Sequence, residues 1–246
     1  MDTICRRAAL TCLVAILAAA FAASPAGQSP DRVRAWRAQH ERDVLRELMA
    51  LVALPNVAAN RADIQKNVPV LVSMFEKRGF RVQTLDTPGS PVIVARKDAQ
   101  PSRGILTLYV HYDGQPVDPR EWTHGGPFTP TLLLGGRTVS LDSPAPIDPE
   151  TRLYGRSTGD DKSPIVGLLA AVDALAASGV AIPWTLHVVL DGEEEAGSPN
   201  FTPAVTAHAE DIRGDVAVMI DGPRHPSGRP TVYFGVRGGA GATITV

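Results

Sequence analysis

The sequence predicts an α/β fold with a mostly parallel mixed sheet flanked by helices. Segments with helical periodicity alternate with short β-branched runs, the pattern of strands joined by helices. Polar and acidic residues gather where several predicted strands end, as they do around the sites of such sheets. Of the 246 residues, 44% are hydrophobic and 20% charged, enough for one substantial core.

The first half is predicted to hold two helices followed by three strands. An apolar stripe over residues 31–53 indicates an amphipathic helix, which Pro55 ends. A second stripe predicts a helix over residues 62–78, closed by the glycine of "KRGF". The runs "FRVQTL", "PVIVAR" and "ILTLYVHY" are bounded by turn-forming residues and are predicted to be strands.

The second half continues the alternation after a long irregular stretch. Residues 114–153 are rich in glycine and proline and show little periodicity, so they are predicted to be mostly loop. Helices are then expected over residues 163–178 and near 202–212, and strands over 184–190 and 215–220. "TVYFGVRG" and "GATITV" are predicted to be two further strands.

The N-terminus has the layout of a secretory signal peptide. "MDTICRR" ends in two arginines, "AALTCLVAILAAAFAA" is apolar, and small and then polar residues follow. Removal of residues 1–26 would leave a secreted or periplasmic protein without a membrane attachment. An uncleaved anchor is the alternative, although an anchor usually needs about 20 apolar residues. Both cysteines, Cys5 and Cys12, lie in this segment, so the mature chain would have neither a disulfide nor a thiol ligand.

Two polar stretches in the middle of the chain carry candidate chemistry. In "LYVHYDGQP", His111 and Asp113 share one face of a predicted strand, where the carboxylate could orient the imidazole. In "LYGRSTGDDKSP", an aspartate ahead of a helix could bind a metal or simply cap the helix. The order of P-loop residues is absent, which argues against nucleotide binding.

Two further acidic stretches follow predicted strands. "DGEEEAGSPN" crowds together Asp191, Glu193, Glu194 and Glu195, whose pKa values should rise unless a cation lies nearby. A divalent metal would relieve the repulsion, with one glutamate as ligand and its neighbour taking a proton from metal-bound water. In "VAVMIDGP", Asp221 could supply another oxygen ligand. Taken alone, each stretch also fits a solvated loop or a turn.

Histidine and carboxylate side chains together make a mixed nitrogen and oxygen ligand set. Zinc accepts such ligands at about 2.0–2.2 Å. Two ions about 3.5–4 Å apart are usual in hydrolases that work in this way. We therefore expect two Zn²⁺ ions in a complete site, with Mn²⁺ or Co²⁺ as alternatives.

In this order and spacing, "HYDGQPVD", "LYGRSTGDDKSP", "EEEAGS" and "MIDGP" resemble the dinuclear-zinc exopeptidase family. That family includes carnosinase-type dipeptidases, glutamate carboxypeptidase, aminoacylase and succinyl-diaminopimelate desuccinylase. The likeness runs from about residue 40 to the end of the chain. The resemblance implies that one zinc ion is bound by His111 and Asp221, that Asp160 bridges both ions and Glu195 binds the second, that Asp113 orients the histidine, and that Glu194 is the general base.

The chain departs from the family pattern in two places. Family members usually show "GRGSTDDKG" where this chain has "GRSTGDDKS", so Ser157 and Ser163 replace glycines, which often serve a positive φ angle or a close approach. Family enzymes also continue into a lid domain with the dimer contact, and then to a last metal-binding histidine. We therefore expect residues 27–236 to be the N-terminal part of an incomplete catalytic domain and 237–246 to begin a lid domain that is otherwise absent. Weak metal loading, little activity of this chain alone and a homodimer only in a full-length form would follow.

The expected function is that of an exported metallo-exopeptidase of the dipeptidase or carboxypeptidase type. It would hydrolyse a dipeptide or an N-acyl amino acid. A deacylase of the same family is one alternative. A catalytically incompetent remnant that binds a metal or a peptide is another, and the DNA beyond the Val246 codon would distinguish it. The formal net charge of -2 argues against a nucleic-acid partner.

Overall fold

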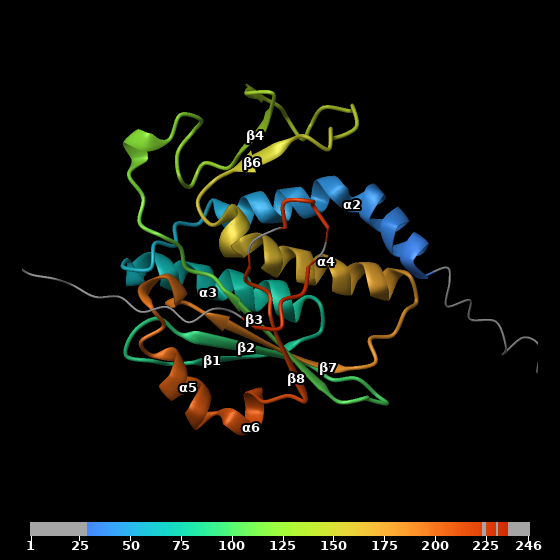
Figure 1. Ribbon diagram of the computed structural model, residues 1–246, viewed down its shortest axis with the longest axis vertical. Helices are drawn as coiled ribbons and strands as arrows, with labels where there is room; N and C mark the ends of the chain where they lie inside the picture. Colours follow the sequence, from blue (N-terminus) through green and yellow to red (C-terminus); the bar gives the residue numbers. More distant parts are fainter. Residues whose placement is uncertain (1–28, 223–224, 230, 236–246) are drawn as a thin grey trace, which may run out of the picture.

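The computed structural model describes residues 29–222, 225–229 and 231–235. Three long helices cover one face of a five-stranded sheet, and two short helices lie against the other face (Figure 1). The predicted signal segment 1–26, the predicted strand "GATITV" and the expected start of a lid at 237–246 lie outside the described residues. Within the described part, none of the helices combines the length and the apolar character that crossing a membrane requires.

The main sheet has the strand order β1-β2-β7-β3-β8. Its strands are β1 (Arg81–Leu85), β2 (Val92–Lys97), β3 (Ile105–His111), β7 (Thr185–Asp191) and β8 (Val216–Met219). Strand β3 pairs in parallel with β7 and with β8, whereas β2 is antiparallel to both β1 and β7. The predicted α/β fold with a mixed sheet is confirmed, and the parallel pairings lie on the side of the sheet that carries β7, β3 and β8.

The long helices form close to where the apolar stripes predict them. They are α2 (Ser29–Val52), α3 (Arg61–Glu76) and α4 (Ser163–Ala177). Asn60 caps α3 by accepting a hydrogen bond from the Asp63 amide at 3.2 Å. Gly79 follows α3 with a φ of +76°, the left-handed conformation that glycine adopts freely after a helix.

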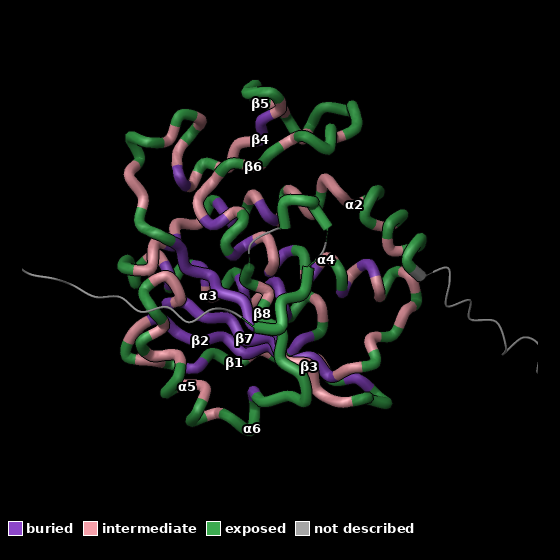
Figure 2. The backbone as a smooth tube through the Cα atoms, in the orientation of Figure 1, coloured by how far each residue is buried: buried purple, intermediate pink, exposed green. Residues whose placement is uncertain are grey.

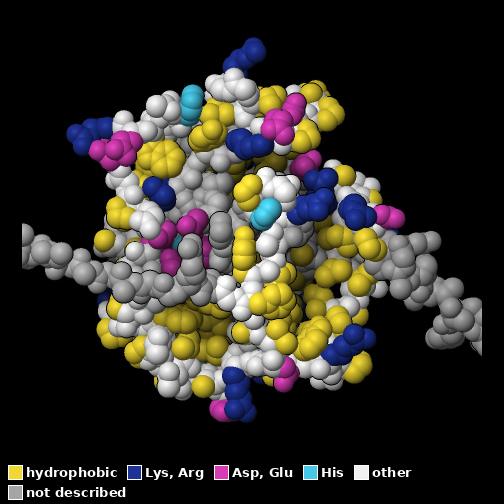
Figure 3. Space-filling view, viewed as in Figure 1, with side chains coloured by type: hydrophobic (Ala, Val, Ile, Leu, Met, Phe, Trp, Pro, Cys, Tyr) yellow, Lys and Arg dark blue, Asp and Glu magenta, His cyan; other side chains and the backbone are white. Residues whose placement is uncertain are grey.

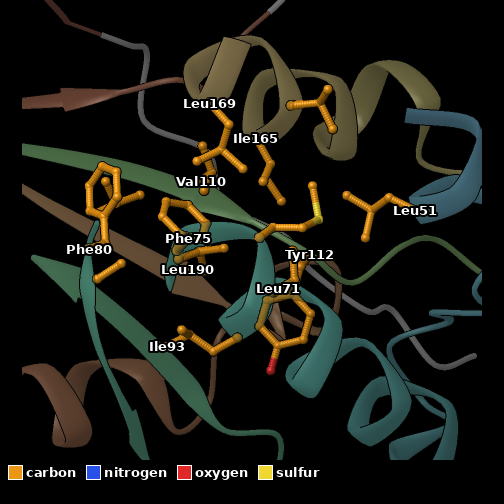
Figure 4. Close-up of a cluster of buried hydrophobic side chains, with 14 of the residues drawn as sticks. Leu51, Leu71, Phe75, Phe80, Ile93, Val110, Tyr112, Ile165, Leu169 and Leu190 are labelled. Atoms are coloured by element: carbon orange, nitrogen blue, oxygen red, sulfur yellow. The ribbon is translucent and has the colours of Figure 1, made fainter. Parts of the chain in front are cut away.

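The core lies between the three long helices and the sheet. Leu51, Phe75 and Leu169 from the helices are buried against Ile93 and Leu190 from the strands (Figure 4). The central strands are therefore the most deeply buried part of the chain, while β8 at the edge of the sheet is exposed (Figure 2). A smaller apolar cluster on the opposite face packs α5 (Phe201–Ala207) against β2 and β7.

Residues 114–153 are mostly loop, as predicted, but they also hold short elements that their glycine and proline content did not indicate. They form a short 3-10 helix (Pro119–Glu121) and the strands β4 (Thr131–Leu134) and β5 (Arg137–Thr138). Strand β6 (Arg152–Tyr154) begins at the end of the same stretch. The strands make a second, three-stranded sheet in the order β5-β4-β6. The two glycines between β4 and β5 have φ values of +55° and +79°, as a two-residue hairpin turn requires. "TLLLGGRT" was thus a hairpin signal that the overall glycine and proline content obscured.

Two other predictions need correction near the C-terminus. The helix expected near residues 202–212 is divided at His208 into α5 and α6 (Ala209–Ile212). The described residues 231–235 of "TVYFGVRG" form no strand. Their side chains are exposed, and Phe234 is exposed completely, so these apolar residues gain neither burial nor strand pairing.

Arg78 connects the three long helices through its guanidinium group. Its Nη2 donates to Glu47 of α2 at 2.8 Å, and its Nε donates to Asp173 of α4 at 2.8 Å. The Arg78 side chain is only 12% exposed, so water screens these ion pairs less than it screens pairs on the open surface.

We expect Arg78→Met to lower the free energy of unfolding by about 2 kcal/mol, because it leaves two carboxylates without their cation. The two carboxylates are partly exposed, so the loss should fall short of that for a fully buried pair. Urea unfolding would measure it. Arg46→Met is the matched control, since Arg46 makes only exposed ion pairs, and it should change stability by no more than about 0.5 kcal/mol. Equal losses for the two variants would contradict this role of Arg78.

Candidate metal centre

The predicted site residues come together at one edge of the main sheet. His111 ends β3 and pairs with Asp191, the last residue of β7. Asp221 follows β8, two residues after its end. Because parallel strands bring their carboxyl ends to the same edge, the polar stretches that follow them meet there. Figure 3 shows acidic side chains gathered together on this face of the molecule.

His111 is the centre of this group, and its two ring nitrogens face different partners. The side chain is fully buried, and Nδ1 lies 3.2 Å from Asp113 Oδ1. Nε2 lies 2.7 Å from Asp160 Oδ1 and 3.9 Å from both Glu194 Oε2 and Asp221 Oδ2. The nitrogen that could bind a metal therefore points at carboxylate oxygens, while the other nitrogen is held from behind.

Asp113 holds more than the imidazole. It is fully buried, and besides His111 it accepts two backbone hydrogen bonds from the acidic turn. The Glu194 amide donates to Oδ1 at 3.1 Å, and the Glu195 amide donates to Oδ2 at 2.9 Å. One carboxylate thus fixes both the histidine and the backbone of the two glutamates assigned to the site.

The acidic stretch after β7 divides into two carboxylates that are tied into the fold and two that face the site. Asp191 accepts from the Ser198 hydroxyl at 2.6 Å and from the Glu193 amide at 2.9 Å. Glu193, to which the sequence assigned no role, accepts from the Ser90 amide at 2.7 Å and from Asn200 Nδ2 at 2.8 Å. Glu194 and Glu195 open the short helix Glu194–Ala196 on the site side. Gln115 Nε2 donates a hydrogen bond to Glu195 Oε2.

The two aspartates before α4 point to different places. Asp160 faces His111 Nε2, whereas the buried Asp161 accepts a hydrogen bond from the His111 backbone amide at 3.1 Å. Lys162 is fully buried and donates to the carbonyls of Leu51 and Leu54, each at 2.8 Å. Lys162 is also the N-cap of α4 and makes no capping hydrogen bond with its side chain. Helix capping therefore does not explain this stretch. The sequence "GDDK" carries no signal that separates the buried Asp161 from Asp160, which faces the site.

Crowding shifts the pKa values of the groups at this edge. Burial, reinforced by Asp221 and Asp160, raises the pKa of Asp161 to about 8. Burial and neighbouring carboxylates also raise the pKa values of Glu194 and Glu195. Burial alone would lower the pKa of His111, but the hydrogen bond and charge of Asp113 and the nearby aspartates raise it to about 10. Without a metal, the site reduces its repulsion by holding protons.

The ligand atoms lie close enough together to hold a metal ion. Two sets have all their ligand atoms within 4.8 Å of one another: His111 with Asp160 and Asp221, and His111 with Glu194 and Glu195. The first set contains the residues that the sequence assigned to one ion. For the second ion the sequence assigned Asp160 and Glu195, whose charges also interact, since Asp160 raises the pKa of Glu195. One nitrogen and several carboxylate oxygens fit a zinc site, and the individual ligand roles stay predictions.

The part of the chain that carries these residues is similar to known peptidases. Residues 107–237 match the model of "Peptidase family M20/M25/M40". The chain is 26% identical to the Cys-Gly metallodipeptidase dug1 of Schizosaccharomyces pombe over 214 residues, which cover 81% of this chain and 42% of that protein. It is 24% identical to the human Beta-Ala-His dipeptidase over 217 residues, covering 81% of this chain and 40% of that protein.

A solved structure shows the same arrangement of elements. The M20 family metallo-carboxypeptidase Sso-CP2 from Sulfolobus solfataricus superposes with a TM-score of 0.63 at 27% identity, covering 76% of this chain and 39% of that one. The chain therefore spans less than half the length of these relatives.

We expect Asp113→Asn to weaken zinc binding by about 10- to 100-fold, because an amide replaces one of the two acceptor oxygens that hold His111 and the acidic turn. Competition with a chromophoric chelator would measure the affinity. Asp118→Asn is a suitable control, because Asp118 contacts Arg120 on the 3-10 helix and should leave affinity within about twofold. Similar affinities for the two variants would argue against an orienting role for Asp113.

We also expect metal binding to release a proton. The metal-free imidazole of His111 has a pKa of about 10 and is protonated at neutral pH, whereas a ligating imidazole must be neutral. Below that pKa, affinity should fall as pH falls, by about tenfold per pH unit for each proton released. Calorimetric titration with zinc in buffers of different ionisation enthalpy would count the protons. An affinity that does not change between about pH 6 and pH 8 would show that no such proton is displaced.

Proposed function

The chain belongs to peptidase family M20/M25/M40. On that premise we propose that it is part of a metallo-exopeptidase that hydrolyses the peptide bond of dipeptides. Peptidases of this family use zinc, and the residues at the edge of the sheet fit that ion. The observation that carries the proposal is His111, whose Nε2 faces Asp160, Glu194 and Asp221 while Asp113 holds Nδ1. A structural histidine would not need this many carboxylates around its free nitrogen.

The proposed division of labour follows the sequence assignments. His111, Asp160 and Asp221, whose ligand atoms lie within 4.8 Å of one another, would hold one zinc ion. Asp160 and Glu195, whose charges interact, would hold the second. When bound, zinc would polarise the scissile carbonyl and make a nearby water molecule more acidic. The remaining chemistry belongs to the side chains of the protein.

Glu194 is the proposed general base. Its Oε2 lies 3.9 Å from His111 Nε2, so it borders the space that the ligand atoms surround. From there Oε2 would take a proton from the attacking water and deliver it to the nitrogen of the leaving amine. Asp113 supports this role because it accepts a hydrogen bond from the Glu194 backbone amide and so fixes the position of the backbone that carries the Glu194 side chain.

Small dipeptides are the proposed substrate class, with N-acyl amino acids as the alternative. Relatives act on Cys-Gly and on Beta-Ala-His, as their names state, and both are dipeptides. Export to the periplasm or beyond the cell is also proposed. It depends on the signal-like residues 1–26 alone, and cell fractionation would test it.

We expect Glu194→Gln to lower turnover by about 10²- to 10⁴-fold while leaving zinc binding in place, because the amide cannot accept the proton. The assay would follow release of free amino acids from Cys-Gly and from Beta-Ala-His. It should use the protein in the longest form that its gene encodes, loaded with zinc.

The matched control is Glu193→Gln, the same change one residue earlier in a side chain that binds Ser90 and Asn200. This variant should keep most of its turnover. Full activity of Glu194→Gln, or a larger loss in Glu193→Gln, would reject Glu194 as the base. No release of amino acids by the unaltered protein would reject the proposed hydrolysis itself.

A further inference from the structure

Ser157 has a backbone conformation that few residues other than glycine adopt readily. Its φ is 61° and its ψ is 16°, in the left-handed region. Ser163, the other serine that stands where the family pattern has glycine, has a φ of -69° and begins α4 in the ordinary way. Only at Ser157 is there a conformational reason for glycine, so a serine there needs some compensating contact.

Asn56 supplies that contact from the loop between α2 and α3. Its side-chain Nδ2 donates one hydrogen bond to Ser157 Oγ at 3.0 Å and another to the Tyr112 carbonyl at 2.8 Å. The Ser157 hydroxyl in turn lies 3.3 Å from Asn56 Oδ1 and 3.5 Å from the Asp113 carbonyl. Asn56 is fully buried and Ser157 is 4% exposed. Breaking these bonds would therefore leave buried polar groups with neither a protein partner nor water to bond to, which lowers stability.

The backbone packs tightly around this pair of side chains. Val57 forms a parallel bridge with Gly114, and the Ala58 amide donates to the Gly114 carbonyl at 2.9 Å. A Cβ atom at Gly114 would overlap Ser157 Oγ, so the hydroxyl occupies space that this glycine leaves open. Three segments that are distant in the sequence therefore meet at one buried point.

Two of these segments carry metal-centre residues. Tyr112, whose carbonyl Asn56 binds, lies between His111 and Asp113. Ser157 lies three residues before Asp160 in the same loop. A contact that joins the end of β3 to this loop fixes the separation of the His111 imidazole and the Asp160 carboxylate.

We propose that Asn56 and Ser157 are positioning residues, which hold the Asp160 loop against the end of β3 so that His111 and Asp160 can share one metal ion. The inference rests on the proposed metal-binding function and adds to it two residues that are not predicted metal ligands, of which Asn56 lies outside every candidate motif. It differs from a purely structural role, because it requires that loss of the pair weakens metal binding more than an equal loss of folding stability elsewhere would.

The test compares Co²⁺ binding, followed by its visible absorption, in the unaltered chain, Asn56→Ala, Ser157→Gly and the double variant. Thr185→Val is the matched control, because the Thr185 hydroxyl also makes a buried bond to the backbone, accepting from the Ala99 amide at 3.2 Å. Thr185 begins β7, about 20 Å along the strand from the metal centre at its other end. Urea unfolding of each metal-free variant measures the stability loss separately.

We expect Asn56→Ala to weaken Co²⁺ binding by about 10- to 100-fold, as losses of supporting hydrogen bonds do. Ser157→Gly should weaken it too, although glycine suits the φ of 61°, and this variant should fold even if Asn56→Ala does not. The double variant should bind about as well as the weaker single variant, because both substitutions break the same contact. Thr185→Val should bind within about twofold of the unaltered chain.

Two results would overturn the inference alone: Co²⁺ affinities of Asn56→Ala and Ser157→Gly equal to that of Thr185→Val, or fully additive losses in the double variant. If the unaltered chain bound no Co²⁺ at all, the proposed metal centre would be wrong, and this inference would fall with it. Co²⁺ binding by the unaltered chain therefore shows whether the metal centre itself or only the role of Asn56 and Ser157 is wrong.

Discussion

Repulsion among carboxylates at the end of β3 is the constraint on which the site depends. Asp160, Glu194 and Asp221 all lie within 3.9 Å of one imidazole nitrogen. Glu194 and Asp221 are partly buried, which limits the water that screens them, whereas the Asp160 side chain is largely exposed. The metal-free chain offsets part of this repulsion by keeping protons on His111 and Asp161. A divalent cation offsets it better, because one ion replaces several protons and satisfies several oxygens at once.

Many buried hydrogen bonds position these side chains. Parallel strands bring the polar segments to one edge, and Asp113 then fixes the imidazole and two backbone amides together. Asp191 and Glu193 turn away from the site and tie the acidic turn to neighbouring loops, which leaves Glu194 and Glu195 facing inward. Repulsion within the acidic stretch is therefore partly relieved by protein donors, and a metal is needed only for the inward-facing pair.

The sequence was informative where a rule of local geometry applied. Helical and strand periodicity predicts most of the long elements, and the strand-end rule places His111, Asp113 and Asp221 at one edge of the sheet. It was uninformative where a role depends on partners far along the chain. Glu193 binds Ser90, 103 residues away, and Asn56 binds Ser157, 101 residues away, so nothing near either residue marks its role. The second sheet was missed because composition was given more weight than the Gly-Gly turn within it.

Anomalous X-ray diffraction at the zinc absorption edge, from crystals grown with zinc, tests the metal centre most directly. We expect a zinc peak about 2.0–2.2 Å from His111 Nε2 and from carboxylate oxygens of Asp160 and Asp221. A second peak, about 3.5–4 Å from the first, should lie between Asp160 and Glu195. An absence of zinc beside His111 in otherwise well-ordered crystals, or zinc held by a different set of residues, would contradict a metal centre at this edge of the sheet.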